Sequence, residues 1–189
     1  DCLLSRGLGD VYKRQLQDSG VTGSVTLTAG DGGNTVLLET VTVGGDTAIT
    51  TGSGVDAITL LDSGLTGALT LNAGDGGNTV MLDTVTVGGD TAITTGSGVD
   101  AITLLDIGLT GALTLNAGDG DNTILLESLP APLVMRVSPP TVTVCSTTPL
   151  SPLPAATVRS PVRPLSTSAI RSLPVPVVIA VSPPTVTVS

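Results

Sequence analysis

The chain has 189 residues, a net charge of −9, one tyrosine, and no histidine, phenylalanine or tryptophan. Compact mixed folds fill their cores with large aromatic side chains, so this composition argues against such a fold. The negative charge opposes nucleic-acid binding, and no apolar run is long enough for insertion into a membrane.

The first fifteen residues differ in character from everything that follows. Residues 5–15 read SRGLGDVYKRQ, which resembles the translation of a transposon-based sequencing-library primer. Segments of that origin are excluded from an argument about folding. We therefore expect no structure in residues 1–15. The alternative interpretation is a natural basic N-terminal segment.

Residues 16–127 repeat every 44 residues, and each repeat divides into two related halves of 22. In the 22-residue alignment two positions are always glycine, namely 30, 52, 74, 96 and 118, and 32, 54, 76, 98 and 120. Aliphatic positions follow, and the most regular of them is Leu38, Leu60, Leu82, Leu104 and Leu126. A fixed period in the twenties predicts a repeat architecture.

Within each half, apolar residues alternate with small polar ones, as in VTLTA at 25–29 and NTVLLETVTV at 34–43. This period of two predicts strands, and the glycine density opposes helices. One rung cannot bury its own apolar face, whereas rungs stacked about 4.8 Å apart can. The sequence predicts an all-β fold, a parallel β-solenoid (β-helix) of about five 22-residue rungs over 16–127. We expect the native protein to continue into further repeats or caps.

Residues 16–127 contain fourteen of the sixteen acidic residues and no lysine, arginine or cysteine. A nucleophile of the triad kind has no base here, because the chain has no histidine. Carboxylates recur in every rung, whereas a catalytic pair is a local exception to a pattern. We therefore expect no enzyme activity and no catalytic residues.

The turn TGSGVDAI at 51–58 resembles the G-G-x-G-x-D-x-U turn of RTX calcium-binding repeats, with threonine in place of the first glycine. AGDGGNTV at 29–36 is a second variant with asparagine in place of aspartate. More broadly, residues 16–127 are similar to bacterial extracellular β-strand-repeat and adhesin-type proteins. The period of 22 departs from the nine-residue RTX period.

Carboxylates stacked at the rung spacing repel one another, and a hard cation such as Ca²⁺ would relieve the repulsion. The candidate calcium ligands, together with turn carbonyls, are Asp31, Asn34, Asp56, Asp75, Asn78, Asp100, Asp119 and Asn122. The alternative, which we favour, is an Asn/Asp ladder that satisfies its own turns.

The Pro/Thr/Val-rich tail, residues 128–189, also repeats every 44 residues but has almost no sequence in common with residues 16–127. If the first two bases of each body codon are read as their reverse complement, Gly becomes Pro, Thr becomes Val and Asp becomes Ser. Applied backwards to residues 84–96, this rule gives residues 176–188 without a mismatch. We interpret the tail as an antisense reading of the same DNA and expect it to be disordered or irregular. The alternative is a natural stalk or linker.

These observations favour a noncatalytic, extracellular, structural or adhesin-like repeat segment of a larger bacterial surface or secreted protein. Its expected partners are neighbouring repeats and an unidentified surface or matrix ligand. The alternative is a calcium-binding RTX-like segment of a secreted protein.

Overall fold

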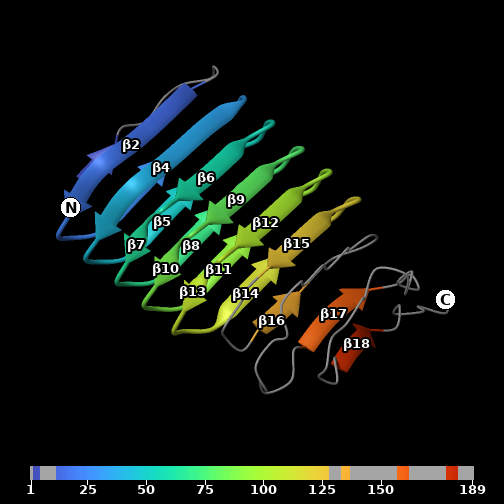
Figure 1. Cartoon of the computed structure of the whole chain (residues 1–189). Helices are drawn as coiled ribbons and strands as arrows, with labels where there is room; N and C mark the ends of the chain where they lie inside the picture. The colour runs from blue at the N-terminus through green and yellow to red at the C-terminus, as the bar shows by residue number, and fades with distance from the viewer. Residues whose placement is uncertain (1, 5–11, 128–132, 137–156, 162–177, 183–189) are drawn as a thin grey trace.

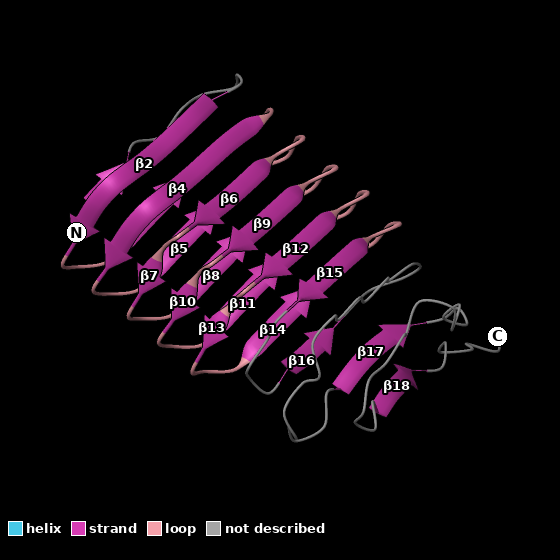
Figure 2. Ribbon diagram, in the orientation of Figure 1, coloured by secondary structure: helices cyan, strands magenta, loops and turns pink. Residues whose placement is uncertain are grey.

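The computed structural model describes residues 2–4, 12–127, 133–136, 157–161 and 178–182, and these residues form a parallel β-solenoid (Figure 1). All regular structure in the described residues is strand (Figure 2). The described part contains no helix that is long and apolar enough to cross a membrane. The prediction of an all-β parallel solenoid of about five rungs is confirmed.

Each rung contributes a strand to each of two sheets. The first sheet contains β1 (Cys2–Leu4), β3 (Val25–Thr28), β5 (Thr47–Thr50), β8 (Leu69–Asn72), β11 (Thr91–Thr94), β14 (Leu113–Asn116), β16 (Leu133–Arg136), β17 (Thr157–Pro161) and β18 (Val178–Ser182). The second sheet contains β2 (Tyr12–Val21), β4 (Asn34–Val43), β6 (Ala57–Leu61), β9 (Thr79–Asp83), β12 (Ala101–Leu105) and β15 (Thr123–Glu127), with the short extensions β7 (Gly64–Leu65), β10 (Thr86–Val87) and β13 (Gly108–Leu109).

The pairing register in the body is constant at 22 residues. Thr47 pairs with Leu69 in the first sheet, and Ile58 pairs with Val80 in the second. The turns stack in the same way, since backbone hydrogen bonds also link the turns of adjacent rungs. Because the register equals the sequence repeat, each alignment column becomes a physical column along the solenoid.

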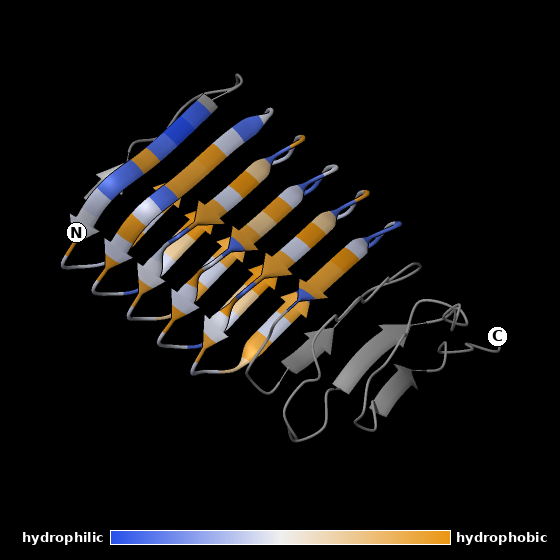
Figure 3. Ribbon diagram, viewed as in Figure 1, coloured by the Kyte–Doolittle hydropathy of each residue, from blue (hydrophilic) through white to orange (hydrophobic). Residues whose placement is uncertain are grey.

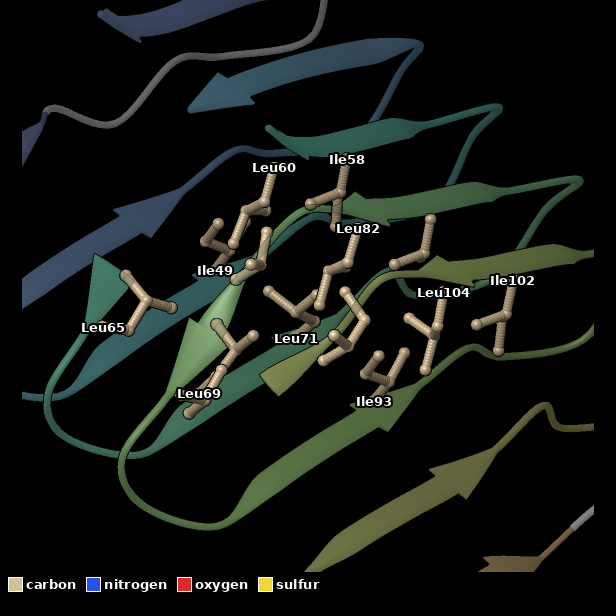
Figure 4. Close-up of a cluster of buried hydrophobic side chains, with 14 of the residues drawn as sticks. Ile49, Ile58, Leu60, Leu65, Leu69, Leu71, Leu82, Ile93, Ile102 and Leu104 are labelled. Carbon is tan, nitrogen blue, oxygen red and sulfur yellow. The ribbon is translucent and has the colours of Figure 1, made fainter. Parts of the chain in front are cut away.

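The core lies between the two sheets and consists of these columns (Figure 4). Strands of the first sheet alternate buried and outward residues, as the period of two predicts. The leucine column is buried in every rung: Leu38, Leu60, Leu82, Leu104 and Leu126 are at most 2% exposed. Stacked sheets are only about 10 Å apart, a gap that aliphatic side chains from both sides fill. This spacing accounts for the scarcity of aromatic residues.

A left-handed bend recurs in the second sheet every 22 residues from Asp18 to Asp106, and the sequence analysis did not predict it. The residue at the bend has a left-handed backbone without being glycine; these residues are Asp18, Thr40, Asp62, Thr84 and Asp106, with φ between 47° and 57°. The bend separates β6 from β7, β9 from β10 and β12 from β13, whereas β2 and β4 continue through it. Aspartate tolerates this conformation, but it is strained for β-branched threonine.

The second glycine column has positive φ throughout, from 97° at Gly32 to 148° at Gly98. In the first column only Gly74 and Gly118 have positive φ. Close approach between turns constrains both columns. A Cβ atom at Gly76, for example, would overlap the carbonyl oxygen of Gly54 in the next rung. Positive φ therefore accounts for glycine throughout the second column, and close approach accounts for it in most of the first.

Structure begins earlier than the sequence analysis predicts. Strand β2 starts at Tyr12, and Cys2–Leu4 pairs with β3, so the expectation of no structure is wrong at these residues. The physical reason is that an unpaired sheet edge binds whatever chain lies next to it. The register places Arg14 opposite Val36, so this rung has a basic residue in an aliphatic column.

Three short pieces of the tail, β16, β17 and β18, extend the first sheet. This differs from the expectation of a disordered or irregular tail, whose other residues lie outside the described residues. The register of 22 is lost here: Leu113 pairs with Leu133, twenty residues on, and Val134 pairs with Thr157, twenty-three residues on. The regular solenoid therefore ends with β15.

We predict that Gly76→Ala lowers the free energy of unfolding by at least about 1–3 kcal/mol, since the residue combines φ of 121° with a backbone overlap. Gly64→Ala is the matched control, because the nearest atom to its Cβ would be the Thr86 hydroxyl oxygen at 3.6 Å. Urea denaturation measures both variants. Equal stability of the two variants would contradict the stacked-turn geometry.

Candidate functional site

All eight predicted calcium ligands lie in the turns that lead from the first sheet to the second. We call this side of the solenoid the turn edge, comprising residues 29–34, 51–56, 73–78, 95–100 and 117–122. Two turn sequences alternate along it, AGDGGN-type and TGSGVD-type. The eight residues form two ladders, one buried and one exposed.

The buried ladder is Asn34, Asp56, Asn78, Asp100 and Asn122, each at most 2% exposed. Each residue hydrogen-bonds the next rung through its backbone. The Asn34 N–H donates to Asp56 Oδ1 at 2.7 Å, and the Asp56 N–H donates to Asn78 Oδ1 at 3.0 Å. The same bond repeats at 2.8 and 2.9 Å in the next two steps. These four bonds join each rung to the next through the ladder side chains.

The asparagine amides also close their own turns. Asn78 Nδ2 donates to the carbonyl oxygens of Gly74 at 3.0 Å and Gly76 at 3.1 Å. Asn34 Nδ2 makes the corresponding bonds to Gly30 and Gly32. In these rungs a neutral amide donor therefore satisfies the turn carbonyls.

The aspartate rungs lack that donor. Oδ2 of Asp56 and Oδ2 of Asp100 are buried without a hydrogen-bond partner. Burial is the main cause that raises the pKa of Asp100, and the charge of Asp75 adds to it. The hydrogen bond from the Asn78 backbone N–H acts in the opposite direction.

Threonine accompanies each buried aspartate. Thr51 and Thr95 are buried where the asparagine rungs have alanine, and the Thr95 hydroxyl donates to the Ala117 carbonyl at 2.8 Å. The sequence analysis missed these two residues as part of the site. The available signal was their pairing with aspartate: the turns with threonine end in Asp, and those with alanine end in Asn.

The exposed ladder alternates aspartate with serine: Asp31, Ser53, Asp75, Ser97 and Asp119. Asp31 Oδ1 accepts the Ser53 backbone N–H and the Ser53 hydroxyl, both at 2.9 Å. These two bonds, the backbone one first, lower the pKa of Asp31, and the equivalent bonds from Ser97 lower the pKa of Asp75. One carboxylate oxygen of Asp31, and one of Asp75, thus links two rungs.

The opposite side of the solenoid repeats this arrangement. Asp46 Oδ1 accepts the Ala68 N–H at 2.9 Å, and Asp90 Oδ1 accepts the Ala112 N–H at 2.8 Å. The sequence analysis did not single out these aspartates, although the same alternation marks them. They show that a carboxylate capping the next rung is a general feature of the solenoid.

Alternation solves the electrostatic problem posed by the sequence. Across residues 16–127, no acidic residue has another acidic residue 22 positions away. Adjacent rungs are about 4.8 Å apart, so acids of one column are separated by at least about 9.6 Å, beyond the screening length of about 8 Å in physiological salt. Direct stacking of carboxylates is thereby avoided without any cation, and a 44-residue unit of two different halves is required.

The described residues contain no group of three or more His, Cys, Asp or Glu side chains positioned to hold a metal ion. The ladders place Asp75 near enough to Asp100 to raise its pKa, while the other candidates are spread along the turn edge. Calcium binding at these residues stays a prediction.

Comparisons with known proteins give no assignment: no family model, no curated protein and no solved structure matches the chain.

The two kinds of aspartate predict opposite pH effects. The raised pKa of Asp100 means that the folded state holds this proton more tightly than the unfolded state does. The resulting contribution to the free energy of unfolding is fully present below an ordinary aspartate pKa of about 4 and is lost as pH rises through the folded pKa. The lowered pKa of Asp75 means that its contribution is present at neutral pH and is lost as pH falls through the folded value.

We therefore predict that Asp100→Asn gains stability over the parent chain between about pH 4 and pH 7, whereas Asp75→Asn is less stable than the parent at pH 7 and converges with it in acid. Melting temperatures of the three proteins measured across this range check both signs. The same pH trend in both variants would contradict the two-ladder description.

Proposed function

We propose that the chain is a noncatalytic, extracellular, structural or adhesin-like repeat segment of a larger bacterial surface or secreted protein. The observation that carries this proposal is the use of the recurring polar groups. In both ladders, the side chains that could have formed a site instead donate or accept bonds between rungs. Such a segment serves as a stiff spacer that presents or connects other parts of its parent protein.

The noncatalytic part of the proposal is supported by composition. The chain has no histidine, and residues 16–127 contain no lysine, arginine or cysteine. Triad-type nucleophilic catalysis therefore lacks its base. Carboxylates can also act as bases, but here they recur along the repeat instead of forming one local pair. The extracellular part is supported only by the resemblance to adhesin-type repeats, and detection of the parent protein in the secreted or surface fraction of its host tests it.

A calcium-responsive segment is the second candidate, because of the two buried aspartates. Oδ2 of Asp56 and Oδ2 of Asp100 are acceptors without a donor, each in a turn of the TGSGVD type. Ca²⁺ takes six to eight oxygen ligands, so a site here would require turn carbonyls and water as well as the carboxylate. The test below separates the two candidates.

We predict that the chain folds without Ca²⁺, and that added Ca²⁺ or chelator changes neither its circular dichroism spectrum nor its melting temperature, because the inter-rung bonds need no ion. The double variant Asp56→Asn with Asp100→Asn is the matched control, as it converts every rung to the asparagine type. A rise in melting temperature with Ca²⁺ in the parent chain, but not in the double variant, would favour the calcium-responsive segment instead.

A further inference from the structure

The two sheets have different residue patterns. First-sheet strands such as β8 alternate strictly between buried and outward residues, with small polar residues outside. Second-sheet strands carry continuous apolar runs, for example Val36–Leu38 in β4, Leu60 and Leu61 in β6, and Val80–Leu82 in β9. In parallel sheets, continuous apolar runs are typical of strands covered on both faces. The outer face of the second sheet, however, has no covering element among the described residues.

Large apolar side chains follow one another down this outer face. They are Leu37, Leu61, Met81, Leu105 and Leu125, one in each rung, and all are partly exposed. Because Leu37 and Met81 share one column while Leu61 and Leu105 share the next, the five form a continuous zigzag. Figure 3 shows apolar residues across β6, β9, β12 and β15. Partly exposed apolar side chains on an uncovered sheet face are candidates for an interaction surface.

We propose that this face binds the same face of a second copy of the chain, related by a two-fold axis along the solenoid. Such an axis places each rung opposite the same rung of the other copy. It also places each margin of the face opposite the other margin of the second copy. One margin is the column of Thr35, Ala57, Thr79, Ala101 and Thr123; the other is Glu39, Leu61, Asp83, Leu105 and Glu127.

The margins are complementary in size and in hydrogen bonding. Asp83 of one copy lies over Thr79 of the other, so a carboxylate faces a hydroxyl donor. Leu61 lies over Ala57, so a large side chain faces a small one. The central column, which includes Met81, faces the same column of the other copy. An isologous interface requires this kind of self-complementarity.

Charge also favours this two-fold arrangement over one in which each margin faces the same margin of the other copy. In the rungs of Glu39, Asp83 and Glu127, the acids of the two copies lie on opposite margins, separated by about four residues of strand, or roughly 13 Å. Two sheets in this orientation belong to the aligned class of face-to-face packing, about 10 Å apart. The acids therefore stay at the rims, where water can screen them.

The area determines how strong the association is. A five-residue strand over five rungs gives a flat footprint on the order of 400 Å² per copy, about half of the roughly 800 Å² per partner of a stable interface. We expect a weak, concentration-dependent dimer whose affinity increases with each additional rung.

Sedimentation equilibrium of the full chain, from micromolar to millimolar concentration, tests the pairing. We expect reversible dimerisation at the upper end. Thr79→Lys places an ammonium group over Asp83 of the other copy, twice per dimer, and tightens association by about tenfold at low salt, an effect that high salt removes. Thr79→Glu weakens association by a similar factor, because carboxylates then face each other.

The control is Thr70→Lys, an exposed site on the outer face of the first sheet, which leaves association unchanged. Circular dichroism confirms that each variant is folded. A parent chain that stays monomeric at millimolar concentration overturns the proposal. So does dimerisation that Thr79→Lys and Thr79→Glu shift in the same direction, or that only Thr70→Lys disrupts.

Discussion

The regular contacts between residues 12 and 127 depend on one constraint: each paired strand residue has its partner 22 positions along the chain. Backbone hydrogen bonds enforce this register in both sheets and through the turns. A shift of one residue would turn every buried side chain outward, so register and core stabilise each other. The leucine and isoleucine columns, the glycine turns and the polar ladders are all consequences of the same spacing.

The alternation of two rung types follows from that register. If all the 22-residue rungs had the same sequence, each acidic side chain would lie directly on the same acidic side chain of the next rung. Residues 16–127 have no basic residue to compensate for that repulsion. Doubling the unit to 44 allows serine, alanine, threonine, asparagine or leucine to separate the acids. The separating residue often donates to the acid beside it, as Ser53 does to Asp31. Charge separation and inter-rung bonding therefore use the same positions.

Much of this could be predicted from sequence, because the register equals the repeat. The burial of Leu60 and the close approach at Gly76 are both properties of alignment columns. The bend at Thr84 was not predictable, since threonine is a poor residue for a left-handed backbone. The pairing of Tyr12 was missed for a different reason: the origin of a segment does not determine whether an open sheet edge binds it.

The candidate site was predicted in position but not in chemistry. Asp31 and Asp56 lie in equivalent turns, yet one is exposed and the other is 1% exposed. Strand parity contained the signal, because Asp56 has the same parity as the buried Ile58. What parity could not reveal is the unpaired Oδ2 beneath each TGSGVD turn, which depends on replacing an amide donor with a carboxylate.

Continuous-wave electron paramagnetic resonance tests the register most directly. Spin labels are attached at Thr70→Cys and Ala92→Cys, which are cross-strand partners on the outer face of the first sheet, after Cys2 and Cys145 are replaced by serine. The constant register predicts strong spin–spin broadening for this pair and none for labels at Thr70→Cys and Thr103→Cys, which lie on opposite outer faces. A spectrum of the 70/92 pair without broadening would contradict the account.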